Sequence, residues 1–161
     1  QLRRQRQMCK ETGIGAGNFI VEIQQSSDIT YRIYDFDRID KNGKKRELHT
    51  DLALEAIDFD EYDDYKGHLE LDRQGTALIK RCDKFVSELM RVETPMTVDV
   101  KSTGSFRILI CISGEVEIAG SNGSRERLAT CDTVLLPYAL DKAVVTPVGG
   151  EPAELISVVV E

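Results

Sequence analysis

The sequence predicts an all-β fold with one short connecting helix, of the β-sandwich or jelly-roll class. Two observations support this class. From about Ala77 onward, short strand-like runs alternate with glycine and asparagine turns. Within that region, the run "ILICI" is apolar on both faces, as expected for a strand between two packed sheets.

The first half of the chain predicts extended structure followed by a helix. A glycine-rich turn, "TGIGAG", leads into the predicted strand "NFIVEIQQ" and a second extended run, "ITYRIYDF". Asn42-Gly43 is a strong turn signal that closes this region. The segment "HTDLALEAIDF" predicts a short helix with Thr50 as its N-cap and Asp51 in its first turn. The face that we expect to be apolar holds Leu48, Leu52 and Ala56.

The second half predicts a series of strands. "KFVSELMRV" and "TVDVKS" are half-buried strands, and "SFRILICISGEVEIAG" is a hairpin that turns at Gly114. Asn122-Gly123 marks another hairpin. "CDTVLLP" is a short buried strand that Pro137 ends, and the last strands are "KAVVTPV" and "AELISVVV". The acidic run from Asp58 to Tyr65 and the segment "KGHLELDRQGT" are predicted loops.

Charge and cysteine content exclude several classes of protein. The net charge of −7 argues against a general binder of nucleic acid or of anionic membranes, which would repel the chain. The leader "QLRRQRQMCK" carries only positive charge, which is typical of a solvated chain end. The four cysteines form no C-x-x-C pair, so we expect reduced thiols and a cytoplasmic protein, with Cys111 as a small core residue. No apolar run approaches the roughly 20 residues that span a bilayer.

The sequence also shows no clear motif for binding a metal ion or a nucleotide. Neither His49 nor His68 lies in a zinc-binding pattern. The glycines of "TGIGAG" precede a predicted strand rather than following one, so we interpret them as a turn with positive φ angles and not as a dinucleotide-binding loop.

The segment from Glu22 to Arg38 is unusually polar for a core strand. Asp28 and Arg32 are four residues apart, so in an extended segment their side chains leave from the same face. Arginine suits the binding of phosphate or of a developing oxyanion. Glu22 and Gln24 are two residues apart in the preceding predicted strand, so their side chains leave from the same face of it. The residues alone leave two readings open: a polar binding site, or a structural ion pair with satisfied polar neighbours.

The stretches "IGAGNFIVEIQQSSDITYRIYDFDR" and "GKKRELHTDLALEAIDF" resemble type I phosphomannose isomerase (mannose-6-phosphate isomerase). "FRILICISGEVEI" and "LATCDTVLLPYAL" are similar to the end of the same family. The resemblance covers roughly residues 13–161 and implies a cupin-like jelly roll. It also implies an aldose–ketose isomerase that interconverts mannose 6-phosphate and fructose 6-phosphate, moving a proton between C1 and C2 through a cis-enediol.

The resemblance also implies roles for particular residues. The family motif S-D-x-x-x-R matches Ser27, Asp28 and Arg32. Arg32 would stabilise the charge of the enediolate, and Asp28 would orient Arg32 or assist proton transfer. The substrate-binding residues would be Gln24, Ser27 and Glu22.

The family uses zinc, but this chain departs from its ligand pattern. Thr12 occupies the position of the family's last histidine ligand, and the other family ligands lie upstream of the segments present here. The chain therefore resembles the C-terminal half, and we expect it alone to hold no zinc. Near "CDTVLLPYALDK" the second cupin block has no histidine, so that block is expected to be metal-free and structural.

The resulting domain prediction has three parts. Residues 1–45 are a basic leader and the final strands of a cupin catalytic domain, residues 46–75 a helical and acidic connector, and residues 76–161 a C-terminal cupin-like β domain. The function is an isomerase completed by residues outside this chain, or a non-catalytic cupin-like domain that binds a sugar phosphate or regulates without metal. The expected partner is a sugar phosphate, with no nucleic acid or membrane. A homodimer could form by strand pairing through residues 13–40, because those strands would lack sheet partners.

Overall fold

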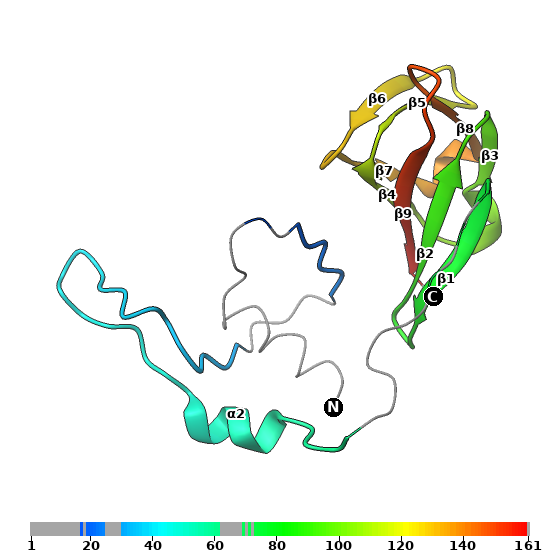
Figure 1. The fold of residues 1–161 in the computed structure, drawn as a ribbon. Coiled ribbons are helices and arrows are strands. Elements are labelled where there is room, and N and C mark those ends of the chain that lie inside the picture. The colour runs from blue at the N-terminus through cyan, green and yellow to red at the C-terminus, as the bar shows by residue number, and fades with distance from the viewer. Residues whose placement is uncertain are drawn as a thin grey trace. The chain divides into compact units, whose positions relative to one another are not determined.

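The computed structural model describes Gly17, residues 19–24 and 30–61, Leu69, Leu71 and residues 73–160. The chain divides into two compact units, residues 1–63 and residues 64–161. Figure 1 gives the labels of the elements.

In the second unit, strands of residues 75–160 form two antiparallel sheets. The five-stranded sheet has the order β1-β2-β9-β4-β7, and the four-stranded sheet has the order β3-β8-β5-β6 (Figure 1). The strands are β1 (Gly75–Arg81), β2 (Phe85–Val92), β3 (Met96–Asp99), β4 (Arg107–Ser113), β5 (Glu115–Gly120), β6 (Arg125–Ala129), β7 (Thr133–Leu136), β8 (Lys142–Pro147) and β9 (Ala153–Val160). Short 3₁₀ helices, η1 (Lys101–Thr103) and η2 (Tyr138–Leu140), lie in the connections before β4 and β8. The all-β sandwich prediction is confirmed.

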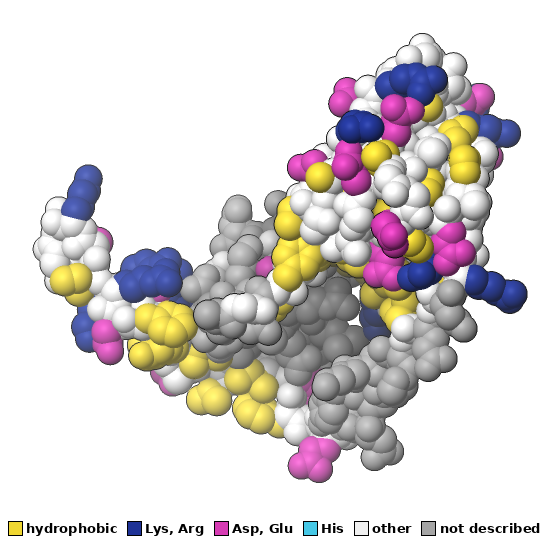
Figure 2. Space-filling model, turned by 45° about the horizontal axis from the view of Figure 1, so that its top comes forward, with side chains coloured by type: hydrophobic (Ala, Val, Ile, Leu, Met, Phe, Trp, Pro, Cys, Tyr) yellow, Lys and Arg dark blue, Asp and Glu magenta, His cyan; other side chains and the backbone are white. Residues whose placement is uncertain are grey.

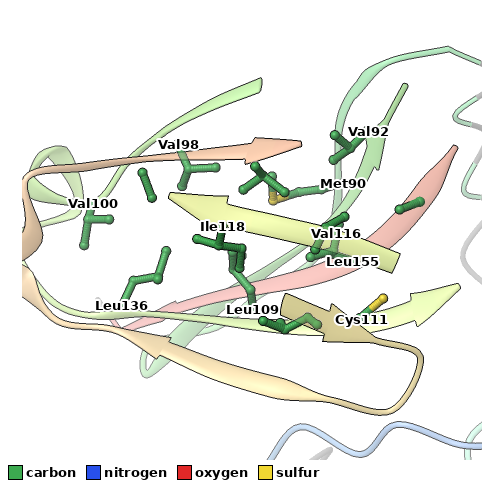
Figure 3. Close-up of a cluster of buried hydrophobic side chains, with 14 of the residues drawn as sticks. Met90, Val92, Val98, Val100, Leu109, Cys111, Val116, Ile118, Leu136 and Leu155 are labelled. Atoms are coloured by element: carbon green, nitrogen blue, oxygen red, sulfur yellow. The ribbon is translucent and has the colours of Figure 1, made fainter. Parts of the chain in front are cut away.

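One hydrophobic core lies between the two sheets. Charged side chains of both signs are spread over the surface of the sandwich (Figure 2), while its inner faces are apolar. Met90, Leu109 and Leu155 come from the five-stranded sheet and are at most 1% exposed. Val116 and Ile118 of β5 pack into the same cluster from the other sheet (Figure 3). Cys111 is fully buried in this cluster, as predicted.

Residues 105–120 do not form the predicted hairpin. Strand β4 pairs with β7 and β9, whereas β5 pairs with β6 and β8, so the chain crosses from one sheet to the other at Gly114. Gly114 has a φ of +77°. The hairpin predicted at Asn122-Gly123 is confirmed, since β5 and β6 pair directly across it.

A Gly114→Ala substitution is expected to destabilise the sandwich more than Gly123→Ala does. Both glycines have positive φ, which costs an alanine about 1–2 kcal/mol. At Gly114 a Cβ would also lie 3.0 Å from the carbonyl oxygen of Pro152, whereas the space at Gly123 is open. Urea unfolding should therefore show an extra loss of roughly 1–3 kcal/mol for Gly114→Ala. Equal losses in the two variants would show that the close approach at the crossing does not matter.

Two further strand predictions need correction. Strand β1 begins where the sequence predicts only a loop, and the register of its pairing with β2 shifts between Leu78 and Lys80. Strand β7 matches the predicted "CDTVLLP" strand, but only its Leu136 is buried. The reason is its position at the edge of the five-stranded sheet, where one side has no neighbouring strand.

In the first unit, the predicted helix is confirmed as α2 (Thr50–Ala56), with two corrections. Its N-cap is His49 rather than Thr50. The buried face holds Ala53 and Ala56, while Leu48 and Leu52 are each 48% exposed. Tyr31, Ile33 and Ile57 pack against the two alanines. Small side chains on this face allow the preceding extended segment to lie close to the helix.

The two strands predicted for residues 18–36 are not present in the described parts of that region. Residues 19–24 and 30–36 have irregular backbone, and the nearest β-type pairing is an isolated bridge between Ile39 and Lys45. Between them, the predicted turn at Asn42-Gly43 is confirmed: Gly43 has a φ of +76°, and the Asp40 carboxylate accepts hydrogen bonds from the N–H groups of Asn42 and Lys44. Gly17 also has positive φ, as expected for the "TGIGAG" turn.

Candidate functional site

Arg32 is fixed through its backbone to the start of helix α2. The carbonyl of Arg32 accepts a hydrogen bond from the N–H of His49 (2.7 Å). In return, the N–H of Arg32 donates to Nδ1 of His49 (3.1 Å). This reciprocal pair holds the half-buried Arg32 at a defined place beside the helix N-terminus.

The guanidinium of Arg32 lies near the segment that precedes the helix. Its Nη1 donates to the carbonyl oxygen of Glu47 (3.2 Å). The predicted partners Ser27 and Asp28 lie outside the described residues, so the pairing of Asp28 with Arg32 stays a prediction. Glu22 and Gln24, also predicted to bind substrate, have exposed side chains.

A buried carboxylate that the sequence did not predict as a site residue lies next to this arginine. Asp35 is only 7% exposed, and its carboxylate is held side-on by Arg46. Nε of Arg46 donates to Oδ2 (2.8 Å), and Nη2 of Arg46 donates to Oδ1. Such bidentate pairs fix both partners in one plane. The predicted turn at Asn42-Gly43 is the sequence signal that could have indicated this pair. The turn reverses the chain, so residues 32–39 lie alongside residues 45–49.

Several arginines lower the pKa of the Asp35 carboxyl group. The hydrogen bond from Arg46 is the main cause that holds the pKa of Asp35 below its usual value. Burial opposes the shift, and the charges of Arg46, Arg32 and Arg38 support it. Arg38 also lies over the ring of Phe36, 5.6 Å from its centroid. The carboxylate of Asp35 thus lies in the field of Arg46, Arg32 and Arg38, which favours its ionised form.

The ion pair between Asp35 and Arg46 is expected to weaken only in strong acid. Because the folded-state pKa of Asp35 is lowered, its ionised form stabilises the fold above the unfolded-state value of about 3.9. That stabilisation is lost as the pH falls through the folded-state pKa. An NMR titration should show the Nε–H signal of Arg46 shifting with a midpoint below about pH 3.9, and Asp35→Asn should abolish the shift. A midpoint at or above that value would contradict the assigned pair.

The described residues do not fit a zinc ion. Among them, no group of three or more His, Cys, Asp or Glu side chains could hold a metal. Nδ1 of His49 already accepts the hydrogen bond of Arg32. Thr12 and His68 lie outside the described residues. No chemical step is therefore assigned to a metal held by this part of the chain.

Comparison with known proteins points to mannose-6-phosphate isomerases. No family model matches the chain. Mannose-6-phosphate isomerase ManA of Bacillus subtilis is 31% identical over 129 residues, which are 79% of this chain and 40% of the relative. Mannose-6-phosphate isomerase of Streptococcus mutans is 54% identical over 44 residues, 27% of this chain and 14% of the relative. The matches thus span less than half the length of these relatives.

The similarity to solved structures concerns the fold. The crystal structure of mannose 6-phosphate isomerase from Bacillus subtilis superposes with a TM-score of 0.55 and 23% identity, covering 83% of this chain and 41% of that one. A cupin-2 domain protein from Shewanella frigidimarina covers 56% of this chain with a TM-score of 0.48 and 12% identity. In the described part of the chain, no helix combines the length and apolar character of a membrane span. The chain thus contains a cupin-type jelly roll similar to part of the mannose-6-phosphate isomerases.

Proposed function

We propose that this chain supplies part of an aldose–ketose isomerase that interconverts mannose 6-phosphate and fructose 6-phosphate. Arg32 and Asp28 are its catalytic residues, and Gln24, Ser27 and Glu22 contact the sugar phosphate. The position of Arg32 carries the proposal, because the reciprocal hydrogen bonds with His49 hold it at a defined place beside the start of helix α2. The similarity to ManA over 79% of the chain supports the same reaction class.

In this reaction a base removes the proton from C2 of the open-chain aldose, and the carbonyl oxygen at C1 gains negative charge. In the resulting cis-enediolate a proton moves from the hydroxyl at C2 to the oxygen at C1, and C1 is protonated to give the ketose, so the atoms of substrate and product balance. Arg32 stabilises the oxyanion, which exists only along this path. Asp28 orients Arg32 or assists the proton transfer. A cation fixed before the reaction needs little reorganisation, which is the physical basis of such catalysis.

Zinc, which the resemblance implies, would have to be held mainly by residues outside the described part of this chain. This expectation leads to a second candidate function, a metal-free cupin-like domain that binds a sugar phosphate or regulates. The lack of a three-donor group among the described residues favours it. The two functions differ in turnover and not in their ability to bind the sugar phosphate.

A chimera separates the two functions. In it, the part of this chain that matches Bacillus subtilis ManA, 79% of its residues, replaces its counterpart in that enzyme. The isomerase proposal expects the zinc-loaded chimera to convert mannose 6-phosphate to fructose 6-phosphate, with parent ManA as the positive control. A chimera that is folded and binds mannose 6-phosphate without converting it would support the binding domain instead.

We also propose that the isolated chain forms a homodimer by strand pairing through residues 13–40. The described residues of this region, Gly17, 19–24 and 30–40, belong to neither sheet, and Phe19 and Ile20 are each 58% exposed. Extended segments without partners tend to pair with another copy. Analytical ultracentrifugation should show dimers at micromolar concentration, and a monomer across the whole accessible range would refute the proposal.

A further inference from the structure

An arginine occupies one end of the otherwise apolar inner face of the jelly roll. Arg107 begins β4 and lies on the same face of that strand as Leu109 and Cys111, which are both fully buried. The side chain of Arg107 is only 12% exposed. A guanidinium that is buried to this degree requires acceptors for its N–H groups.

One end of the guanidinium is held by two neighbouring strands. Nη1 of Arg107 donates to Oγ of Ser157 in β9 (2.6 Å). Oε2 of Glu88 in β2 lies 3.6 Å from the same Nη1, as an ion pair longer than a normal hydrogen bond. Glu88 is directly opposite Ser157 in the sheet. This arrangement orients Arg107 from one side of its guanidinium.

On the other edge of the guanidinium, Nε of Arg107 is buried without a hydrogen-bond partner in the described part of the chain. Arg46 shows what this edge can bind, because its Nε and Nη2 together hold the carboxylate of Asp35. Buried donors without acceptors are rare and costly in folded proteins, which indicates that an acceptor belongs at this position.

We propose that this end of the jelly roll binds a small oxyanion, a carboxylate or a phosphate monoester, on the Nε–Nη2 edge of Arg107. Ser157 and Glu88 hold Nη1 and so present the opposite edge to the ligand. The buried Leu109 and Leu136, which is 3% exposed and pairs with Arg107, lower the local dielectric and strengthen the contact with an anion. This site belongs to the second unit and does not depend on Arg32.

The first test is an NMR titration of the ¹⁵N-labelled full chain with inorganic phosphate and, separately, with sodium acetate at constant ionic strength. The Nε–H signal of Arg107 should shift downfield and saturate. Arg91 is the internal control, because its Nε donates to Glu93 (2.9 Å) and its Nη1 to Glu154 (3.2 Å), so its signal should stay constant. Tighter binding of phosphate assigns a phosphate ester as ligand, and tighter binding of acetate assigns a carboxylate. A signal of Arg107 that does not saturate with either anion overturns the proposal.

The second test uses variants in the same titration, followed through backbone amide signals. Arg107→Lys keeps the charge but loses the planar edge, so the affinity for the preferred anion should fall at least about tenfold. Arg91→Lys should bind as the parent does. Glu88→Gln keeps the shape and removes a competing negative charge, so binding should become several-fold tighter. Unchanged affinity in Arg107→Lys overturns the proposal. If that variant does not fold, unchanged affinity in Glu88→Gln overturns it.

Discussion

Replacing Arg32 by alanine is expected to lower kcat for the conversion of mannose 6-phosphate by about 10²–10³ in the zinc-loaded ManA chimera, with a much smaller change in KM. The reason is that Arg32 acts on the charge of the enediolate, which is absent from the bound substrate. An interaction made mainly in the transition state contributes to kcat and little to ground-state binding. Arg32→Lys should also lose much of the rate, because it lacks the planar fork of the guanidinium.

Steady-state kinetics normalised to the folded fraction provide the measurement. Arg38→Ala is the matched control, since Arg38 contributes charge near the same carboxyl group but lies outside the S-D-x-x-x-R motif. Its kcat should stay close to that of the parent chimera. A purely structural Arg32 would instead cost roughly 1–3 kcal/mol of folding free energy and leave turnover per folded molecule intact. That outcome would remove the catalytic roles of both Arg32 and Asp28.

Replacing Leu109 by alanine is expected to reduce the free energy of unfolding of the jelly roll by about 2–5 kcal/mol. Leu109 is fully buried between the sheets, so the truncation removes apolar contacts and leaves a cavity that the rigid strands fill poorly. This loss is a large share of the free energy of unfolding of a native domain, which is usually about 5–15 kcal/mol. Urea unfolding followed by far-ultraviolet circular dichroism measures it.

Leu135→Ala is the control for this prediction. Leu135 lies on the edge strand β7 and is 53% exposed, so its truncation should change the free energy of unfolding by no more than about 0.5 kcal/mol. Similar losses in both variants would mean that Leu109 is not part of a tightly packed core.

Local signals in the sequence predicted most of the jelly roll, but pairing between distant strands did not follow from them. The strands β2, β8 and β9 and the turn at Asn122-Gly123 have clear local patterns. The stretch around Gly114 has the same local pattern as a hairpin. It connects two different sheets because β4 pairs with β9, more than forty residues further along the chain. Short-range patterns cannot specify such pairings.

At the candidate site, too, local sequence features were predicted but contacts between distant residues were not. The resemblance directs attention to Arg32, and the structure adds the hydrogen bonds with His49 that position it. The ion pair of Asp35 with Arg46 depends on how the chain folds back after the turn, so residue types alone did not reveal it. The sequence predicted Leu52 on the buried face of α2, but Ala53 is buried because the adjacent segment packs over the small side chains.

The most direct test of the central claim is the conversion of ¹³C-labelled mannose 6-phosphate by the zinc-loaded ManA chimera, followed by NMR. Signals of fructose 6-phosphate should appear at a rate comparable to that of parent ManA, and Arg32→Ala should suppress them by about 10²–10³. A folded chimera that produces no fructose 6-phosphate, or one whose turnover is unaffected by Arg32→Ala, would contradict the proposed isomerase function.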